Sequence, residues 1–454
     1  MIQNISIIGL GKLGSSMAAC MAHRGLNVIG VDINQGAVEA INAGRAPVEE
    51  TGLGEMIAAN RARLRATTST EEAVRASEIS FVIVPTPSDA RGAFELQYAA
   101  HAFRELGRAL KQKSGYHVIV LTSTVLPGAT RHGLLPLLER ESGKRCGADF
   151  GLCYSPEFIA LGSVLRDFLN PDFYLIGEFD PRSGEALEQV NRHVCQKPAV
   201  IRRMSIENAE LAKIALNSYV TMKISFANLL ADLCERVPGG NVDVVSDALG
   251  TDSRIGRKYL TGGMGFAGPC FPRDNVALSF LCRKLGADAR LLEVNHEYNR
   301  ALPARFIETL QPHVQRGETA AVLGLAYKPM SHIIEESQGV LLARALSEAG
   351  LRVMGYDPLA GQAARTALQY HIVVVDSLTE ALRDATTVLV TTPDDCFRRL
   401  TPEQVRGDKP QVTVVDFWRC VEKNLAGQPN IRYLPIGRCW NEAEAATTLS
   451  RLWQ

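Results

Sequence analysis

Short apolar runs alternate with stretches of helical spacing in the first part of this 454-residue chain. Residues 5–8 predict a strand, and residues 15–24 have the three- and four-residue spacing of an amphipathic helix. Further strands are predicted at 27–31, 79–84 and 118–121. Strands that alternate with helices form a parallel sheet, whose ligands bind beyond the carboxyl ends of the strands. We therefore expect a doubly wound α/β domain over residues 1–200.

A much longer helical pattern follows this domain. Ser205 can cap its beginning, and Glu207 places a negative charge in the first turn, where it is favourable. Apolar residues then recur at three- and four-residue steps until Pro238-Gly239-Gly240 ends the pattern. Because such a helix is longer than the usual globular mean, we expect it to bridge two domains or to form a dimer interface. A helical central domain is placed at residues 201–302.

The C-terminal part of the chain repeats the pattern of the first part. Residues 350–357 match residues 25–32, and residues 322–329 stand where the first strand and its glycine loop stood. In this second copy Ala326 and Pro329 are expected at the places of Gly11 and Gly14. The second copy should therefore not bind a pyrophosphate in the same way. The predicted fold is thus α/β, with two Rossmann-like doubly wound parallel-sheet domains joined by a helical domain with a long central helix. The second Rossmann-like domain is placed at 303–454, and a second ligand is expected in the cleft between two such domains.

A dinucleotide fingerprint lies between the first strand and the first helix, and its residues are Gly9, Leu10, Gly11, Lys12, Leu13 and Gly14. The first glycine permits a tight turn, the second lets the backbone approach a pyrophosphate, and the third packs the helix on the sheet. The helix N-terminus favours the phosphates. Asp32, which ends the second strand, can accept hydrogen bonds from a ribose and would repel a 2′-phosphate. These features predict NAD as the cofactor; the alternative is a glycine turn without a ligand.

Other polar residues have a functional and a structural interpretation. Thr86 and Thr124 follow the ends of two further strands, where a hydroxyl can contact the cofactor or cap the next helix. Glu157 follows another short apolar run and can be a base or a solvated cap residue. Lys213 and Asn217 lie four residues apart on one face of the long helix, either as an exposed stripe or pointing into a cleft.

Composition mainly excludes classes of protein. Lys plus Arg and Asp plus Glu number 49 each, so the formal net charge is zero, which argues against a general nucleic-acid binder. No apolar run approaches the ~18 residues of a membrane span, and the first residues do not resemble a signal peptide. The ten cysteines form neither a Cys-x-x-Cys pair nor a cluster with zinc spacing. We expect a cytoplasmic protein with reduced thiols and with no metal, nucleic-acid or membrane partner.

One cysteine differs from the others through its neighbours. Cys270 lies between a glycine-rich approach that includes Gly265 and an exit of Pro272, Arg273 and Asp274. Glycines let a backbone come close to a ligand, and a thiol beside a cation and a carboxylate is well placed to be a nucleophile. A dehydrogenase with such a thiol can trap an aldehyde, oxidise it again and hydrolyse the product to an acid.

Together these motifs resemble the UDP-glucose/GDP-mannose dehydrogenase family, whose members use NAD to oxidise C6 of a nucleotide-linked sugar twice, to the uronic acid. The resemblance runs from end to end and is carried, in order, by residues 9–14, 84–87, 123–125, 155–158, 208–213, 217, 223–228, 252–256, 270–274 and 324–329.

The resemblance implies a role for each matched residue. Cys270 would be the nucleophile that forms a thiohemiacetal and then a thioester. Lys213 and Asn217 would stabilise negative charge on the oxygen at C6. Asp274 and Glu157 would handle protons and the hydrolytic water. Thr124 would help to place that water. The residues that would contact the cofactor are Thr86, Thr124 and Arg273, the last of which stands where the family usually has Lys. The residues that would contact the substrate are Glu157, Phe158, Lys213, Asn217, Tyr259, Gly265 and Lys328.

The resemblance also implies a homodimer through the long helix, because Arg254 would reach the nucleotide bound by a partner subunit. Four positions depart from the family's pattern. Ala160 and Leu161 replace a usual Arg-Glu pair, and Ala267 replaces a glycine, which is expected to narrow the backbone's approach to the sugar. Glu335 stands where a basic residue is usual, and an acid near phosphates weakens binding unless it is compensated.

The favoured activity is the oxidation of UDP-glucose to UDP-glucuronate in polysaccharide biosynthesis. A UDP-N-acetylhexosamine or GDP-mannose substrate is the alternative within the family. Two other classes stay open: a catalytically silent NAD-binding protein that kept the fold, and a two-electron hydroxyacid dehydrogenase, which has no need of Cys270.

Overall fold

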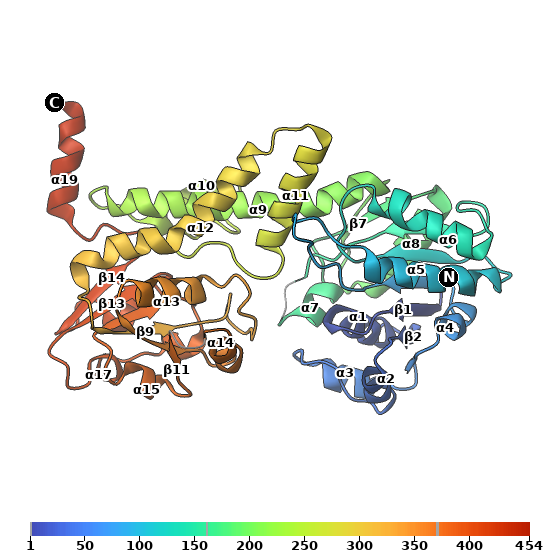
Figure 1. Cartoon of the computed structure of the whole chain (residues 1–454), viewed down its shortest axis with the longest axis horizontal. Helices are drawn as coiled ribbons and strands as arrows, with labels where there is room; N and C mark the ends of the chain where they lie inside the picture. Colours follow the sequence, from blue (N-terminus) through green and yellow to red (C-terminus); the bar gives the residue numbers. More distant parts are fainter. Residues whose placement is uncertain (1, 160–161, 369–371) are drawn as a thin grey trace. The chain divides into compact units, whose positions relative to one another are not determined.

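The computed structural model describes residues 2–159, 162–368 and 372–454, and its chain divides between Leu216 and Asn217 into two compact units (Figure 1). The departures expected at Ala160 and Leu161 lie outside the described residues. The long helix α9 (Ile206–Glu235) begins in the first unit and continues into the second. It ends before Pro238, as its sequence predicts, and the Ser205 hydroxyl accepts a hydrogen bond from the Asn208 N–H (3.3 Å) at its beginning.

The first unit alternates strands and helices along most of its length. Its other elements are β1 (Asn4–Ile8), α1 (Lys12–His23), β2 (Asn27–Val31), α2 (Gln35–Asn42), α3 (Leu53–Ala59), β3 (Leu64–Thr67), α4 (Thr70–Ala76), β4 (Ile79–Val82), α5 (Gln97–Lys111), β5 (Val118–Leu121), the π-helical turn η1 (Ala129–Leu134), α6 (Leu135–Ser142), β6 (Gly151–Tyr154), α7 (Val164–Leu169), β7 (Phe173–Glu178), α8 (Pro181–Val194) and β8 (Val200–Ser205).

These strands form one sheet in the order β3-β2-β1-β4-β5-β6-β7-β8. Neighbours are parallel except β6 and β7, where Tyr154 pairs with Gly177 in antiparallel register. Alternate residues of each central strand enter different hydrophobic clusters, so that Val118 and Val120 face one cluster while Ile119 and Leu121 face the other. Both faces of the sheet are therefore covered, which is the doubly wound arrangement that the sequence predicts.

The predicted strand at 79–84 ends early, at Val82. The cause is a side chain: the Ser123 hydroxyl accepts a hydrogen bond from the Val84 N–H (2.9 Å) and donates one to the Val84 carbonyl (2.7 Å). The backbone of Val84 is thus bonded to a hydroxyl in place of a neighbouring strand. Ser123 is a structural link between two strand ends.

The second unit contains the rest of α9, a group of helices and a second sheet. Its other elements are α10 (Val242–Thr251), α11 (Phe271–Leu285), α12 (Arg290–Leu310), η2 (Gln311–His313), β9 (Thr319–Leu323), α13 (Gln338–Glu348), β10 (Arg352–Tyr356), α14 (Gly361–Ala367), β11 (Val373–Val374), α15 (Leu378–Leu382), β12 (Thr387–Val390), α16 (Asp395–Arg398), α17 (Pro402–Arg406), β13 (Val412–Asp416), α18 (Glu422–Leu425), β14 (Ile431–Pro435), α19 (Glu442–Ser450) and η3 (Arg451–Trp453).

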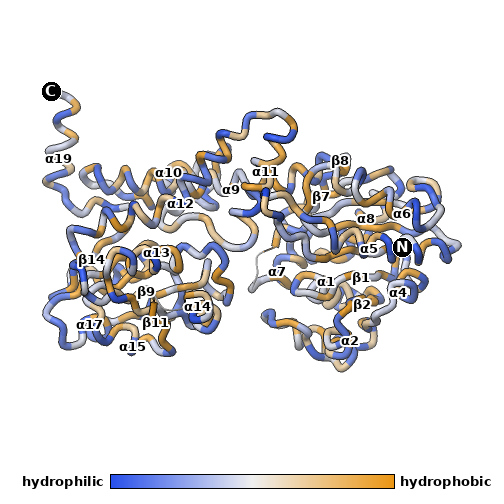
Figure 2. The backbone as a smooth tube through the Cα atoms, viewed as in Figure 1, coloured by the Kyte–Doolittle hydropathy of each residue, from blue (hydrophilic) through white to orange (hydrophobic). Residues whose placement is uncertain are grey.

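This second sheet is fully parallel, in the order β11-β10-β9-β12-β13-β14. The order reproduces β3-β2-β1-β4-β5-β6 of the first sheet, which confirms the internal repeat. Its central strands are buried on both faces, as in the first sheet, and β9 is among the hydrophobic segments in Figure 2. The protein therefore has two Rossmann-like sheets with a helical region between them in the sequence.

One detail of the predicted repeat is wrong. Gly339 of α13, rather than Pro329, occupies the place of Gly14 of α1. A Cβ added to Gly14 would lie 1.8 Å from the Gly9 carbonyl oxygen, and one added to Gly339 would lie 2.2 Å from the Gly324 carbonyl oxygen. The close contact between helix and strand loop is thus kept in both copies. In the second copy, however, a longer loop, 324–337, precedes the helix, and alignment of the sequences without a gap misses this.

Candidate functional site

The fingerprint loop of the first unit has the geometry that a dinucleotide requires. Gly9 has φ +101°, and a Cβ there would lie 2.1 Å from the Ile83 carbonyl oxygen, so only glycine fits. A Cβ added to Gly11 would meet nothing within 4 Å, so the surface is open at this position. Gly11 precedes α1, whose first turn has neither a side-chain cap nor an acidic residue. The N–H groups at this helix end can therefore donate hydrogen bonds to the phosphates of NAD.

The second copy differs at the corresponding helix end. There Ser337 precedes α13, and its hydroxyl accepts a hydrogen bond from the Val340 N–H (3.5 Å). The N-terminus of α13 is thus closed by its own side chain, whereas the N-terminus of α1 is available to a ligand.

Asp32 lies after β2 and beside the fingerprint loop. Its carboxylate accepts hydrogen bonds from the N–H groups of Leu10 (2.7 Å) and Asn34 (2.8 Å). Asp357 makes the matching contact in the second unit, where it accepts from Leu325 and Ala326 (2.8 Å each). A carboxylate has about four acceptor positions, so Asp32 can fix this loop and still accept from the hydroxyls of a ribose.

Two predicted cofactor threonines are joined at the carboxyl edge of the first sheet. The Thr86 hydroxyl, which is buried, donates a hydrogen bond to the Thr124 carbonyl (2.8 Å). Thr124 itself is half-buried and follows β5 in the chain. The structure therefore brings Thr86 and Thr124 together at the edge where Rossmann sheets bind their ligands.

Glu157, Phe158 and Lys213 form a second cluster in the first unit. The Lys213 ammonium donates a hydrogen bond to the Glu157 carbonyl (2.6 Å) and lies 4.3 Å from the centre of the Phe158 ring. Burial raises the pKa of the Glu157 carboxyl to about 7, and the positive charge of Lys213 opposes this shift. A carboxyl with a pKa near neutrality can exchange protons with a reacting group at physiological pH.

The second unit contains the other half of the predicted catalytic set. The Asn217 side-chain amide donates a hydrogen bond to the Asp274 carboxylate (2.6 Å), and both side chains are buried. Arg273 lies 3.4 Å from the same carboxylate. The N–H of Asp274 donates to the Cys270 carbonyl (2.8 Å) in the first turn of α11. Hydrogen bonds therefore join the Asp274 carboxylate to the Asn217 amide, and the backbone of Asp274 to that of Cys270.

Cys270 is the exposed one among the ten cysteines. It immediately precedes α11 and ends a glycine-rich loop. Gly265 in this loop is packed closely, because a Cβ there would lie 2.3 Å from the Asn299 side-chain oxygen. Ala267 is not among the residues with positive φ, so its methyl group fits without backbone strain.

The remaining predicted residues of the second unit lie on loops. Tyr259 has φ +68°, is half exposed and packs edge-to-face with Phe271, next to Cys270. Lys328 is half-buried in the loop after β9, and the carbonyl of Glu335, in the same loop, accepts a hydrogen bond from the Gly268 N–H (3.1 Å). Arg254 is largely exposed and pairs with Asp252 (2.6 Å).

Sequence reasoning missed several residues that hold these loops. Glu210 accepts hydrogen bonds from two backbone N–H groups just after Thr124, and Asn228 and Asn299 bond the backbone of the glycine-rich loop. Buried polar side chains on a helix can be suspected from the sequence, but their partners are distant in the chain.

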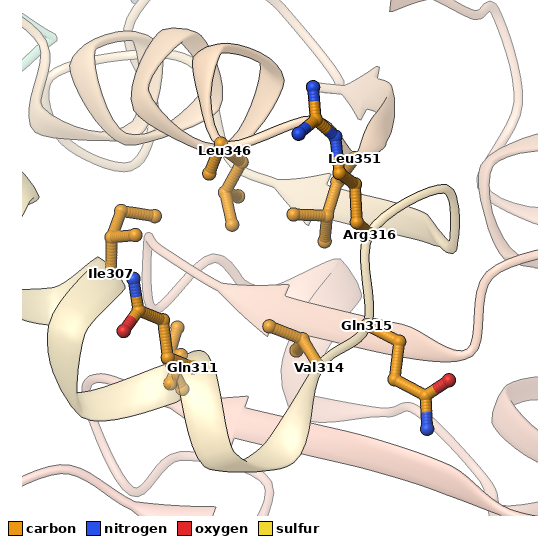
Figure 3. Close-up of a pocket in the computed structure, with 9 residues that line it drawn as sticks. Ile307, Gln311, Val314, Gln315, Arg316, Leu346 and Leu351 are labelled. Carbon is orange, nitrogen blue, oxygen red and sulfur yellow. The ribbon is translucent and has the colours of Figure 1, made fainter.

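A surface pocket of the second unit contains none of the predicted residues. It lies at the end of α12 and is lined mainly by apolar side chains, with Gln311, Gln315 and Arg316 at its edge (Figure 3). No described helix is long and apolar enough to cross a membrane.

Comparison with known proteins identifies the family of the whole chain. Profiles of the UDP-glucose/GDP-mannose dehydrogenase family match residues 3–195 (NAD-binding domain), 207–301 (central domain) and 321–423 (UDP-binding domain). The chain belongs to this family. It is an NAD-dependent nucleotide-sugar dehydrogenase, and its cofactor is NAD.

Individual relatives cover almost the whole chain. A UDP-glucose 6-dehydrogenase of Haloferax volcanii is 37% identical over 88% of this chain and 93% of its own length. A GDP-mannose 6-dehydrogenase of Azotobacter vinelandii is 31% identical over 96% of this chain and 100% of its own length. The solved structure of a UDP-glucose dehydrogenase from Pyrobaculum islandicum superposes with a TM-score of 0.85 at 33% identity, covering 97% of this chain and 98% of that one.

Proposed function

We propose that this family member is a UDP-glucose 6-dehydrogenase that oxidises C6 twice and releases UDP-glucuronate. The similarity to the Haloferax and Pyrobaculum enzymes supports the choice of sugar and base. The position of an exposed thiol at the start of α11, one turn from a buried carboxylate–amide pair, supports the double oxidation. A dehydrogenase that removes one hydride needs no such thiol.

Each step of the reaction has a residue for its chemistry. Bound NAD supplies the hydride acceptor. After the first oxidation, the Cys270 thiolate adds to the aldehyde carbon, and loss of a second hydride converts the resulting thiohemiacetal to a thioester. Water then attacks the thioester carbon, the C–S bond breaks, and the thiolate leaves. Lys213 and Asn217 stabilise the charge on the C6 oxygen.

Proton transfer is assigned to the two carboxyl groups. Asp274, which Asn217 orients, takes the proton of the C6 alcohol. Glu157 activates the water, and its raised pKa suits a base that works near neutrality. Thr124 helps to place that water. Thr86 and Arg273 are proposed to contact the cofactor, and Phe158, Tyr259, Gly265 and Lys328 to contact the sugar nucleotide.

We further propose that two copies of the chain associate through α9. Helix α9 exposes Tyr219 (62%), Phe226 (51%) and Leu233 (49%), and α10 exposes Val244 (64%). Exposed apolar patches of this kind mark interaction sites. In such a dimer Arg254, paired with Asp252 in the single chain, reaches the partner's nucleotide. Phe226→Asp is expected to convert dimers to monomers in light scattering.

NADH formed per sugar tests the function. With UDP-glucose limiting, the wild type should form two NADH per sugar, and Cys270→Ser should form at most one and release no acid. Cys282→Ser, on the same helix, is the matched control and should retain both. Two NADH per sugar from the Cys270→Ser enzyme would overturn the thioester route.

Substrate profiling separates the alternatives within the family. Two NADH per sugar from GDP-mannose alone, which would follow the Azotobacter relative, would overturn the UDP-glucose assignment, as would two from a UDP-N-acetylhexosamine alone. No NADH from any of these sugars, with NAD still bound, would indicate either a sugar nucleotide outside this set or the catalytically silent protein.

A further inference from the structure

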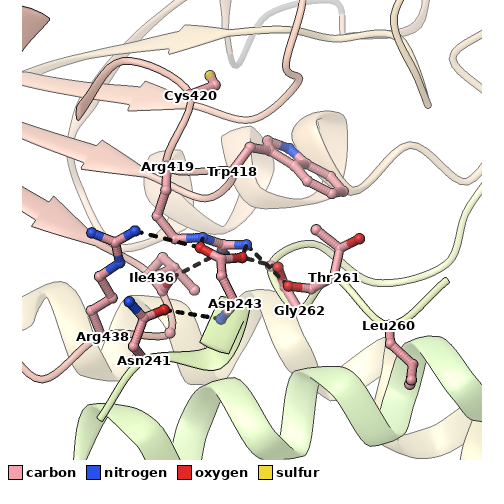
Figure 4. Close-up of polar contacts among 12 residues, drawn as sticks. Asn241, Asp243, Leu260, Thr261, Gly262, Trp418, Arg419, Cys420, Ile436 and Arg438 are labelled. Atoms are coloured by element: carbon pink, nitrogen blue, oxygen red, sulfur yellow. Dashed lines mark hydrogen bonds and ion pairs between the residues drawn. The ribbon is translucent and has the colours of Figure 1, made fainter. Parts of the chain in front are cut away.

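Arg419 is an almost fully buried arginine that neither the family's matched motifs nor the predicted site includes (Figure 4). The residue follows strand β13 of the second sheet in the chain, and its side chain is 3% exposed. Its guanidinium forms a two-point contact with the Asp243 carboxylate, at 3.0 and 2.8 Å. Asp243 lies in the first turn of α10, so this ion pair links the sheet to the helical region within the second unit.

The same guanidinium also donates to four backbone carbonyls. Two of them, Thr261 (3.0 Å) and Gly262 (3.0 Å), belong to the glycine-rich loop that leads to Cys270. The other two, Phe417 (2.9 Å) and Ile436 (3.0 Å), follow strands β13 and β14. A guanidinium has five N–H donors in a rigid fork, and here every nitrogen is used. One side chain thus ties the beginning of the loop to the edge of the sheet.

The rest of the loop is held by two buried asparagines. Asn228 of α9 accepts from the Gly263 N–H (2.7 Å) and donates to the Met264 carbonyl (3.2 Å). Asn299 of α12 accepts from the Phe266 N–H (2.7 Å) and donates to the Phe266 carbonyl (2.9 Å). The backbone between 261 and 266 is therefore fixed at several points, and Arg419 supplies the first of these contacts.

The backbone of Arg419 supports a dedicated role for this side chain. Its φ is +53°, a left-handed conformation that is unfavourable for a residue with a Cβ. Glycine would avoid that cost. The presence of arginine implies that its side-chain contacts more than offset the strain.

We propose that Arg419 is a positioning residue for the nucleophile: it fixes the start of the 261–268 loop, and through that loop the backbone that delivers Cys270 to the sugar. The inference rests on the proposed role of Cys270. It assigns a part in the reaction to the second sheet, through contacts distinct from binding of the nucleotide.

Arg419→Lys is the most direct test. Lysine keeps the positive charge that faces Asp243, but it cannot bond both the loop carbonyls and the carbonyls that follow β13 and β14. We expect kcat to fall about 10- to 100-fold, because small displacements of a reacting group have effects of this size. The Kd for NAD should not change, since the NAD loop lies in the first unit. Amide hydrogen exchange of residues 262–268 should become faster in the full-length protein.

Arg438→Met is the matched control. Arg438 approaches the same Asp243 carboxylate (3.5 Å) and pairs with Glu422, but it is partly exposed and bonds no loop carbonyl among the described residues. Its loss should leave kcat and loop exchange within about twofold of wild type. Should Arg419→Lys fold poorly, Asp243→Asn is the second variant; it leaves the loop carbonyls bonded, and we expect an intermediate effect.

The proposal would be overturned by unchanged exchange of the 262–268 amides in Arg419→Lys, or by faster exchange with wild-type kcat. A lower unfolding midpoint without a change in kcat would likewise show that Arg419 only stabilises the fold. These outcomes are independent of Cys270→Ser, which tests the thioester route in the wild-type background.

Discussion

Glu210 offers a prediction whose size can be worked out from the structure. It lies on α9 with no exposed surface, and its carboxylate accepts hydrogen bonds from the N–H groups of Gly128 (2.6 Å) and Thr130 (2.9 Å). Gly128 ends the segment that connects β5, and Thr124 after it, to η1, and Thr130 lies in the first turn of η1. Glu210→Gln keeps the shape of the side chain but leaves a single acceptor oxygen.

The expected loss follows from the two bonds. A hydrogen bond to a charged group contributes about 1.5–3 kcal/mol, and a buried donor left without a partner costs about 1–3 kcal/mol. Glu210→Gln removes the charge from one bond and leaves one N–H without its acceptor. We therefore expect the free energy of unfolding of the first unit to fall by about 2 kcal/mol, with a further loss for Glu210→Ala because a cavity is added.

Urea unfolding with hydrogen exchange at the Gly128 and Thr130 amides measures this loss. The control is Glu207→Gln, one turn earlier on the same helix, where the carboxylate pairs with Arg131 and both side chains are about one-third exposed. A pair exposed to that extent contributes about 0–1 kcal/mol. If Glu210→Gln cost no more than Glu207→Gln, the two buried hydrogen bonds would not support this segment, and the reasoning would fail.

Two further predictions concern the cofactor loop and the proton balance. Gly14→Ala should destabilise the first unit and abolish NAD binding, because its Cβ would overlap the Gly9 carbonyl, whereas Gly11→Ala should fold normally and only weaken NAD binding in calorimetry. Burial raises the pKa of Glu157 from 4.5 to about 7, so Glu157 binds its proton more tightly in the native protein than in the unfolded chain. The stabilisation that this tighter proton binding provides is complete below pH 4.5 and should be lost as the pH rises through about 7. The rate of acid release should increase over the same pH range, because the Glu157 carboxylate forms there. A rate of acid release that is independent of pH between 5 and 8 would exclude Glu157 as the base.

Much of this protein could be predicted from local patterns in the sequence. The strands at 27–31 and 118–121 are where the apolar runs place them, since a strand buried on both faces needs a continuous apolar run. The fingerprint could be recognised because its turn, helix start and following acid depend on neighbours within one strand–helix–strand unit. The order and spacing of the motifs along the chain were sufficient to indicate the family.

Contacts between distant segments could not be predicted in this way. The early end of β4 depends on Ser123, the true counterpart of Gly14 is displaced to Gly339 by a longer loop, and Arg419 bonds carbonyls more than 150 residues away in the sequence. Sequence alone determined which segments form the strands, the helices and the glycine loop, because those choices are made by neighbouring residues. Only the tertiary structure decided which buried polar groups satisfy one another, because each such pair must exclude water together and its members can lie anywhere along the chain.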